Sequence, residues 1–352
     1  MNGLLGGHRA AISAGGARVE SEMKKRAAVR LLAVAFLACL GWIGQSHAQT
    51  KIARVGVLAT PVAGTPNEAM DKYYEVFRQA LAERGWIQGK NIAFEYRSAR
   101  GSPPQFGEPA AELVRLKVDV IYANNAPATR AAHAATRSIP IVGLDYTNDP
   151  VAAGYAESYS RPGRNLTGFF LDAPEFASKW LELLKSVVPG LSRVAVLWDP
   201  TPGTTHLSAI QGAAQSFTVQ LQIVEVRKPQ DIDAAFSTFR ARTQALVILP
   251  SAMTWAESPR LAELAVKYRL PAISMADLFT QAGGMVSYGP DSAAALRSTA
   301  ILVAKVLDGV KPGDIPVERP TKFKLVVNQK TAKALGLILP QPILVSADNV
   351  IQ

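Results

Sequence analysis

The chain has 352 residues, and its 38 Lys and Arg against 28 Asp and Glu give a formal net charge of +10. The basic surplus is spread along the chain without a Lys/Arg block interleaved with aromatic residues, which argues against a nucleic-acid-binding protein. Cys39 is the sole cysteine, so the chain beyond it can form no disulfide, thiolate nucleophile or cysteine metal site. His133 and His206 are far apart and lack acidic partners at ligand spacing, so we expect no metal and no cofactor.

The first part of the chain has the pattern of an export signal. Met23 to Ala48 carries a cationic head, a short apolar stretch, and small residues at Ser46-His47-Ala48 where a leader peptidase cleaves. The apolar stretch is shorter than the roughly 20 residues of a permanent membrane helix. We predict a signal peptide over residues 1–48, with residues 1–22 preceding a second plausible start, and a mature protein in the periplasm. A lipoprotein signal acylated at Cys39 is the competing interpretation.

From residue 51 onward, short β-branched runs alternate with amphipathic stretches of helical length. Strands separated by helices in this way are joined by right-handed crossovers and form a parallel sheet covered on both faces. The pattern predicts strands at 54–58, 91–96, 119–122 and 139–142, and helices at 68–84, 108–116 and 127–136.

A break over residues 149–165, rich in Pro and Gly, precedes a second series of the same kind. Its predicted strands are 193–198, 222–226, 245–249 and 271–274, and its helices are 173–188, 204–218, 229–240 and 257–268. The elements after residue 284 are too few for a third domain and most simply complete the first two. We therefore predict an α/β fold with two lobes joined by a multi-stranded hinge. Residues 51–145 with about 289–320 form the first lobe, and about 166–288 with 321–352 form the second.

Ligands of open parallel sheets bind beyond the carboxyl ends of the strands, where loops and helix N-termini converge. The residues expected there are short hydrogen-bonding side chains with a few aromatics. This set suits a small zwitterion, with amides and hydroxyls for a carboxylate, Asp for an ammonium and an aromatic ring for an apolar part. Asn, Asp, Ser and Thr at such turns are also ordinary helix N-caps. The candidate ligand-binding residues are Thr60, Asn124, Asn125, Asp145, Tyr146, Trp198, Asp199, Ser251, Asp277 and Tyr288.

Catalytic motifs are mostly missing beyond the leader. The chain has no G-x-S-x-G elbow, no G-x-x-x-x-G-K-[ST] phosphate loop, no G-x-G-x-x-G after the first predicted strand and no H-E-x-x-H. Asn165-Leu166-Thr167 matches a glycosylation sequon, a pattern that arises often by chance. We expect no catalytic residues, although sequence alone does not decide whether two carboxylates form a catalytic pair.

One long run carries a resemblance to a known family. Residues 77–97, FRQALAERGWIQGKNIAFEYR, resemble the F..GL.ELGY.EGKNI.IEYR signature of ABC transporter substrate-binding proteins often grouped with tryptophan and tyrosine binders. Further landmarks of that family follow in the same order, so the resemblance spans essentially the whole chain after the leader. They are IPIV at 139–142, NDPV at 148–151, RPGRNLTG at 161–168, GGMVSYG at 283–289 and PTKFKLVVN at 320–328.

The resemblance implies a type I periplasmic-binding-protein fold, in which two Rossmann-like lobes with parallel sheets are joined by three crossovers. It further implies a small organic solute, an amino acid or related carboxylate, held in the cleft and delivered to an ABC permease in the inner membrane. Trp198-Asp199, Ser251 and Asp277 stand in the second-lobe ligand loops of the family. Asn124 and Asn125 replace its Gly/Thr-rich T-x-P turn, so a tryptophan or tyrosine ligand is not carried over to this chain.

The leading hypothesis is therefore a monomeric, non-enzymatic solute receptor that works by hinge closure and has no nucleic-acid partner. A second hypothesis is an exported α/β hydrolase-type enzyme with Asp199, Asp277 or His206 as the working group. A third is a sensory module that reports its ligand state to a membrane partner instead of a permease.

Overall fold

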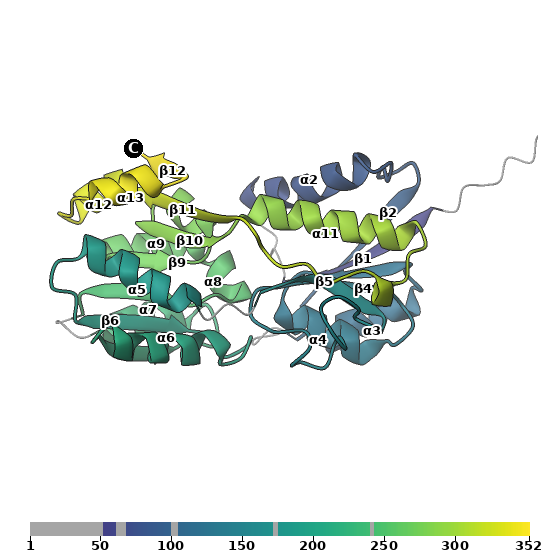
Figure 1. Cartoon of the computed structure of the whole chain (residues 1–352), viewed down its shortest axis with the longest axis horizontal. Helices are drawn as coiled ribbons and strands as arrows, with labels where there is room; N and C mark the ends of the chain where they lie inside the picture. The colour runs from purple at the N-terminus through teal and green to yellow at the C-terminus, as the bar shows by residue number, and fades with distance from the viewer. Residues whose placement is uncertain (1–51, 61–67, 100–104, 172–174, 240–242) are drawn as a thin grey trace, which may run out of the picture. The chain divides into compact units, whose positions relative to one another are not determined.

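The computed structural model describes residues 52–60, 68–99, 105–171, 175–239 and 243–352 (Figure 1). The predicted signal peptide and the alternative anchor Cys39 lie outside these residues. Within the described ranges, no helix combines the length and the apolar character that crossing a bilayer requires.

The first lobe is built on a five-stranded parallel sheet. Its strands are β1 (Ala53–Ala59), β2 (Ile92–Ser98), β3 (Val120–Ala123), β4 (Ile141–Asp145) and β5 (Leu166–Phe170). Their order in the sheet is β2-β1-β3-β4-β5. Strands β3, β4 and β5 are buried along their whole length, as expected for a parallel sheet covered on both faces.

Helices cover both faces of this sheet (Figure 1). Helices α2 (Glu68–Ala82) and α11 (Ser292–Leu307) pack on one face, and α3 (Gly107–Arg115) and α4 (Ala126–Ala135) pack on the other. On the first face, the ring of Phe77 stacks on the ring of Tyr122 with 4.5 Å between centroids. Helix α11 follows the strands of the second lobe in sequence, so the chain returns to complete the first lobe.

The boundary predicted at residue 166 is wrong, because β5 belongs to the first sheet. Each residue of Leu166–Phe170 pairs with β4, and all five are buried. At the centre of this ladder Gly143 faces Gly168, and a Cβ on Gly168 would lie 2.2 Å from the Gly143 carbonyl oxygen. Thr167 and Gly168 interrupt the apolar run, so the sequence pattern does not reveal this strand. The buried strand also places the Asn165 sequon beside the sheet, where the Asn165 amide donates to the Ile139 carbonyl.

The second lobe is built on a seven-stranded sheet with the order β12-β11-β10-β9-β8-β6-β7. Its strands are β6 (Arg193–Trp198), β7 (Gln220–Glu225), β8 (Ala245–Ile248), β9 (Ala272–Ser274), β10 (Val286–Pro290), β11 (Phe323–Asn328) and β12 (Asn349–Ile351). All neighbours are parallel except β10 and β11. The chain leaves β10 for the first lobe and re-enters the sheet at the same edge, so β11 runs in the opposite direction.

Helices cover both faces of this sheet as well. One core lies under α5 (Glu175–Val187), α6 (Thr205–Ser216), α12 (Gln329–Ala334) and α13 (Gln341–Ser346). The other core lies under α7 (Asp231–Thr238), α8 (Ala252–Ala256), α9 (Ser258–Lys267) and α10 (Asp277–Gln281). A 3-10 turn, η2 (Pro312–Asp314), lies between α11 and β11 and packs on β5.

The chain passes from one lobe to the other after β5, after β10 and again before β11. Hydrogen bonds join the described ends of these crossings. The Glu318 amide donates to the Gly168 carbonyl at 2.9 Å, and the Phe170 amide donates to the Glu318 carbonyl at 2.9 Å. The Asp291 amide donates to the Lys322 carbonyl at 3.1 Å. The segments that connect the lobes therefore lie side by side.

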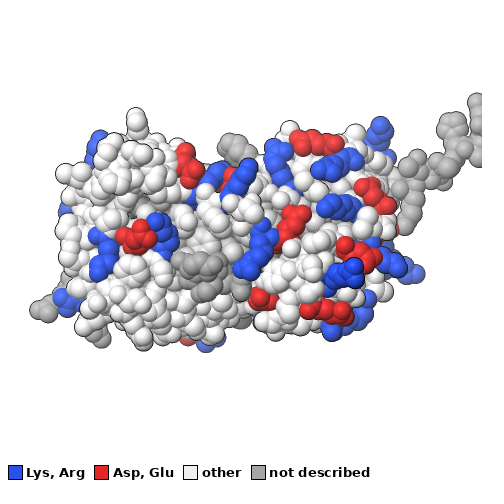
Figure 2. All heavy atoms as spheres, in the orientation of Figure 1, with Lys and Arg blue, Asp and Glu red and all other residues white. Residues whose placement is uncertain are grey.

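Charges on the face drawn in Figure 2 are intermingled over the lobe that carries α2 and α11. Ion pairs in this lobe include Arg78 with Glu75 and Arg297 with Glu83. The basic surplus of the chain is thus interspersed with carboxylates on this face, which is the arrangement of an ordinary solvated surface.

Candidate ligand-binding site

Parallel pairing brings the carboxyl ends of β1 and β3 to one edge of the first sheet, which places Thr60, Asn124 and Asn125 there. The Asn125 amide donates to the Thr60 hydroxyl at 3.0 Å, while its oxygen accepts from the Ala128 amide and caps α4. The Asn124 amide donates to the Tyr74 hydroxyl at 3.2 Å. These three predicted residues and Tyr74 therefore form one hydrogen-bonded wall of amides and hydroxyls.

Tyr74 is a member of this wall that the sequence analysis did not include. It lies on α2, and burial raises the pKa of its phenol to about 12, against a smaller opposing effect of the Asn124 hydrogen bond. The phenol is therefore neutral at physiological pH and keeps a proton to donate. Its position on a helix, away from any strand end, is why a search of strand ends misses it.

Asp145, at the end of β4, is fully buried and organises the loop that follows. One carboxylate oxygen accepts from the amide and the hydroxyl of Thr147, each at 2.8 Å, and the other accepts from the Asn148 amide at 2.7 Å. Burial raises the pKa of Asp145, and these hydrogen bonds oppose the rise. These three hydrogen bonds tie the Asp145 carboxylate to its own loop and thereby shape the wall.

Tyr146 follows Asp145 and points its ring toward the second lobe. The ring lies nearly parallel to that of Trp255, with 6.4 Å between centroids, and edge-on to Phe169. Its hydroxyl is buried and has no hydrogen-bond partner among the described residues. Burial raises the pKa of this phenol, and the charges of Asp277 and Asp291 raise it further. A neutral hydroxyl therefore lies at the junction of the lobes, within the electrostatic influence of two carboxylates.

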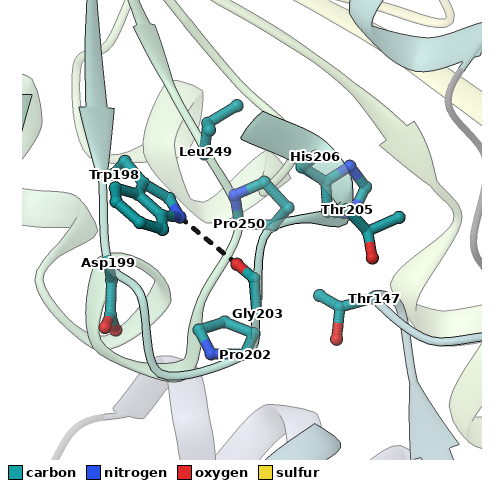
Figure 3. Close-up of a pocket in the computed structure, with 9 residues that line it drawn as sticks. All are labelled: Thr147, Trp198, Asp199, Pro202, Gly203, Thr205, His206, Leu249 and Pro250. Atoms are coloured by element: carbon teal, nitrogen blue, oxygen red, sulfur yellow. Dashed lines mark hydrogen bonds between the residues drawn. The ribbon is translucent and has the colours of Figure 1, made fainter. Parts of the chain in front are cut away.

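Trp198 and Asp199, at the end of β6, lie beside a small hollow that opens to solvent (Figure 3). The Trp198 indole donates to the Gly203 carbonyl at 3.3 Å. Asp199 is buried and accepts from the Thr201 amide at 2.9 Å, and Figure 3 shows its carboxylate pointing away from Thr205 and His206. Thr147 reaches the same hollow from the first lobe. Trp198 thus lines the space between the lobes, whereas Asp199 holds the turn that follows it.

Ser251, after β8, is an N-cap. Its hydroxyl accepts from the Thr254 amide at 3.0 Å, and the Thr254 hydroxyl accepts from the Ser251 amide at 2.9 Å. This capping box fixes the start of α8 and places Trp255 one turn further on, facing Tyr146. Trp255 is not among the predicted site residues. Its place one helical turn after the strand-end cap Ser251 could have indicated it.

Asp277 is the first residue of α10, directly beyond β9, and it is half-buried. Burial raises its pKa, and the nearby charge of Lys324 opposes the rise. The Lys324 ammonium itself pairs with Asp291 at 2.9 Å. For Asp291, burial alone would raise the pKa, but hydrogen bonds from Lys324 and the Ala294 amide outweigh it and hold the pKa below its ordinary value. One lysine therefore serves as counter-ion to both carboxylates.

Tyr288, on β10, packs its ring against Phe176, with 5.6 Å between centroids, and against Phe323. Its carbonyl accepts from the Trp180 indole at 2.9 Å. Tyr288 thus takes part in the aromatic core of the second lobe next to the hinge.

Tyr146 stacks on the unpredicted Trp255 and lies within the electrostatic influence of Asp277, while Thr60, Asn124 and Asn125 gather at the carboxyl ends of β1 and β3. Asp145, Asp199 and Ser251 are occupied by the loops and caps that shape those walls. Among the described residues, no three His, Cys, Asp or Glu side chains are grouped closely enough to hold a metal ion.

The chain is similar in sequence and in fold to known proteins. A sequence model of the family described as ABC transporter substrate binding protein matches residues 59–351. A protein of Clostridioides difficile (strain R20291) named "Tyrosine-binding protein" is 26% identical over 286 residues, which is 80% of each chain. A conserved domain protein of Vibrio cholerae has a solved structure that is 25% identical, with a TM-score of 0.77 over 85% of this chain and 100% of its own. An ABC domain of Streptococcus pneumoniae in complex with L-Trp is 22% identical, with a TM-score of 0.76 over 85% of this chain and 99% of its own.

Proposed function

This chain belongs to the family of ABC transporter substrate-binding proteins, and we propose that it captures a small amino-acid-like solute between its lobes and presents it to a membrane permease. Its fold is that of a type I periplasmic binding protein. The family and the relatives are substrate-binding proteins. The protein is therefore not an enzyme, and the hydrolase hypothesis built on Asp199, Asp277 or His206 is wrong.

The observation that carries the proposed ligand class is the buried Tyr146 hydroxyl, which has no partner among the described residues. A buried hydroxyl without a hydrogen bond costs roughly 1–3 kcal/mol, so a polar group is expected to meet it when a solute binds. The nearby carboxylate of Asp277 favours a cationic group, and the face of Trp255 favours an apolar or aromatic part. An amino acid with an apolar or aromatic side chain combines these features.

The opposite wall is proposed to receive the carboxylate end of the solute. Asn124 and Tyr74 contribute an amide and a hydroxyl to this wall, and Thr60 and Asn125 fix it by their mutual hydrogen bond. Trp198 is proposed to close the side of the space on the second lobe. Two relatives whose names mention tyrosine and L-Trp support the same class of solute for this chain.

The site of action is proposed to be the periplasm. The cationic and apolar pattern of Met23 to Ala48 supports export, as does the family, whose members serve membrane transporters. N-terminal sequencing of the secreted protein tests this proposal. A mature chain that begins just after Ala48 supports the predicted cleavage, and a chain acylated at Cys39 supports a lipid anchor instead.

A thermal-shift screen tests the ligand class. Protein unfolded and refolded to remove any bound solute is melted with each of the 20 amino acids, with aromatic acids and with sugars as an unrelated class. A ligand at 100 times its dissociation constant adds about 2.7 kcal/mol. For a chain of about 300 residues this raises the melting temperature by about 4 °C.

Two variants make the screen specific. Asp277→Asn is expected to lose most of the shift, because it removes the carboxylate proposed to meet the ammonium. Glu263→Gln, which removes an exposed carboxylate on α9, is expected to keep it. A panel that produces no shift at all, together with no solute in the mass spectrum of the protein purified without unfolding, would contradict the proposal.

A further inference from the structure

His206 joins the two lobes by a buried hydrogen bond. It is the second residue of α6 in the second lobe, it is only 5% exposed, and it lines the hollow beside Trp198 (Figure 3). Its Nε2 donates to the carbonyl oxygen of Tyr146 at 2.9 Å, since a carbonyl can only accept. Tyr146 belongs to the loop after β4 of the first lobe, so this bond crosses from one lobe to the other.

Both ends of this bond are held by their own lobes. On the second-lobe side, the imidazole packs 6.0 Å from the ring of fully buried Trp180, whose indole is itself anchored on the Tyr288 carbonyl at 2.9 Å. On the first-lobe side, Asp145 fixes the Tyr146 loop from within by three hydrogen bonds from Thr147 and Asn148. Because neither group can move independently of its own lobe, this hydrogen bond forms only when the two lobes have a particular relative position.

We infer that His206 is a positioning residue that latches the Tyr146 loop to the second lobe and thereby favours the closed arrangement. The latch acts on the residue whose ring faces Trp255 and whose hydroxyl is proposed to meet the solute. A ligand shifts an equilibrium between open and closed states only by its differential affinity for the two states. A residue that lowers the free energy of closing in the absence of ligand therefore raises the apparent affinity. The effect on affinity rests on the proposed function, whereas the effect on lobe placement does not.

A second hydrogen bond between the lobes provides a matched control. The Arg130 guanidinium on α4 donates to the Thr201 carbonyl at 3.2 Å, but this side chain is exposed. Water competes for both groups of an exposed hydrogen bond, so its loss costs little. Arg130→Gln therefore removes a contact between the lobes without disturbing a buried one.

The first experiment measures lobe placement without any ligand. Lys90, before β2, and Lys267, at the end of α9, are exposed and lie in different lobes. With the sole cysteine Cys39 changed to Ser, Lys90→Cys and Lys267→Cys accept two spin labels, and pulsed electron resonance reports the distribution of distances between them. His206→Leu is expected to broaden or shift this distribution, whereas His206→Gln, which keeps a donor near Nε2, and Arg130→Gln are expected to leave it as in the parent protein.

The second experiment titrates the same variants with L-tyrosine and with the other amino acids of the screen. His206→Leu is expected to weaken binding about three- to tenfold, mainly through faster dissociation, which is the loss that one hydrogen bond represents. His206→Gln is expected to recover most of that loss, and Arg130→Gln to change affinity by less than about twofold. Urea unfolding of each variant shows whether any loss reflects a misfolded fraction.

Two results would overturn the latch. One is a His206→Leu distance distribution identical to that of the parent protein. The other is a His206→Gln variant as impaired as His206→Leu, which would assign the residue a packing role only. If the parent protein binds no member of the panel, the proposed function fails, and the ligand-free distances still decide the latch by themselves.

Discussion

Replacing Gly168 by Ala tests the packing that places the ligand loop of the first lobe. Gly168 faces Gly143 in the β4–β5 ladder, and a Cβ at Gly168 would lie 2.2 Å from the Gly143 carbonyl oxygen and 2.7 Å from its nitrogen. Real Cβ atoms stay beyond about 3 Å of such atoms, so the two strands must separate by close to 1 Å. The obstacle is backbone on both sides, and no flexible side chain can move to relieve it.

The expected cost follows from this geometry. Overpacking a well-packed interior costs about 1–3 kcal/mol, and weakening one or two ladder hydrogen bonds adds about 1 kcal/mol each. We expect the Gly168→Ala variant to lose about 2–5 kcal/mol. With an unfolding entropy of about 2.1 cal/mol/K per residue over about 300 residues, this lowers the melting temperature by about 3–8 °C.

The assay is thermal unfolding followed by circular dichroism, with Gly212→Ala as the matched control. Gly212 lies on the exposed side of α6, and a Cβ there meets nothing within 4 Å. Alanine is the better helix former, so this variant should gain about 0.5–1 kcal/mol and melt 1–2 °C higher, again by roughly 0.6 kcal/mol per degree. A Gly168→Ala protein that melts within 1 °C of the parent would refute the reasoning about close backbone approach.

Four further outcomes are expected. At pH 7, Asp277→Asn should weaken binding of L-tyrosine or L-tryptophan by about tenfold or more in calorimetry. The affinity of the parent protein should fall as pH drops through the raised pKa of Asp277, because the protonated carboxyl no longer attracts an ammonium. The affinity of the Asp277→Asn variant should not change over the same pH range. Trp255→Ala should weaken the same binding by about tenfold, and Trp255→Phe by much less, since a flat ring is retained. Asp291→Asn keeps the N-cap but loses the ion pair with half-exposed Lys324. Its free energy of unfolding in urea should be lower than that of the parent protein by about 0.5 kcal/mol above pH 4. This difference should vanish as pH falls through the lowered pKa of Asp291. Thr218→Gly should stabilise the fold by about 1 kcal/mol, because this β-branched residue holds φ at 53°, and equal stability of the two proteins would contradict that strain.

Alternating strand and helix patterns predicted most of the fold correctly, because the parallel strands are nearly continuous apolar runs. The strand Arg193–Trp198 appears in the structure with its predicted bounds. The missed strand Leu166–Phe170 shows where this approach ends. Its Gly168 is required by contact with Gly143, a residue 25 positions away, and no local pattern encodes that contact.

The candidate site divides in the same way. Strand-end reasoning selected Tyr146 and Asp277, whose charge acts on the Tyr146 phenol, together with Asp145 and Ser251, whose hydrogen bonds lie within their own loops. An Asp or Ser at a strand end looks the same in sequence whether it meets a solute or caps a helix. Only the hydrogen bonds of the folded chain separate the two roles.

The sequence by itself determined the alternation of strands and helices, the absence of cysteine after the leader and the set of polar residues at the strand ends, because each depends on residue type and local spacing. The tertiary structure alone decided that Trp255 faces Tyr146, that His206 reaches a carbonyl of the other lobe and that Lys324 serves two carboxylates. These contacts join residues tens to more than a hundred positions apart, and the first two arise only when the crossings between the lobes bring the lobes together.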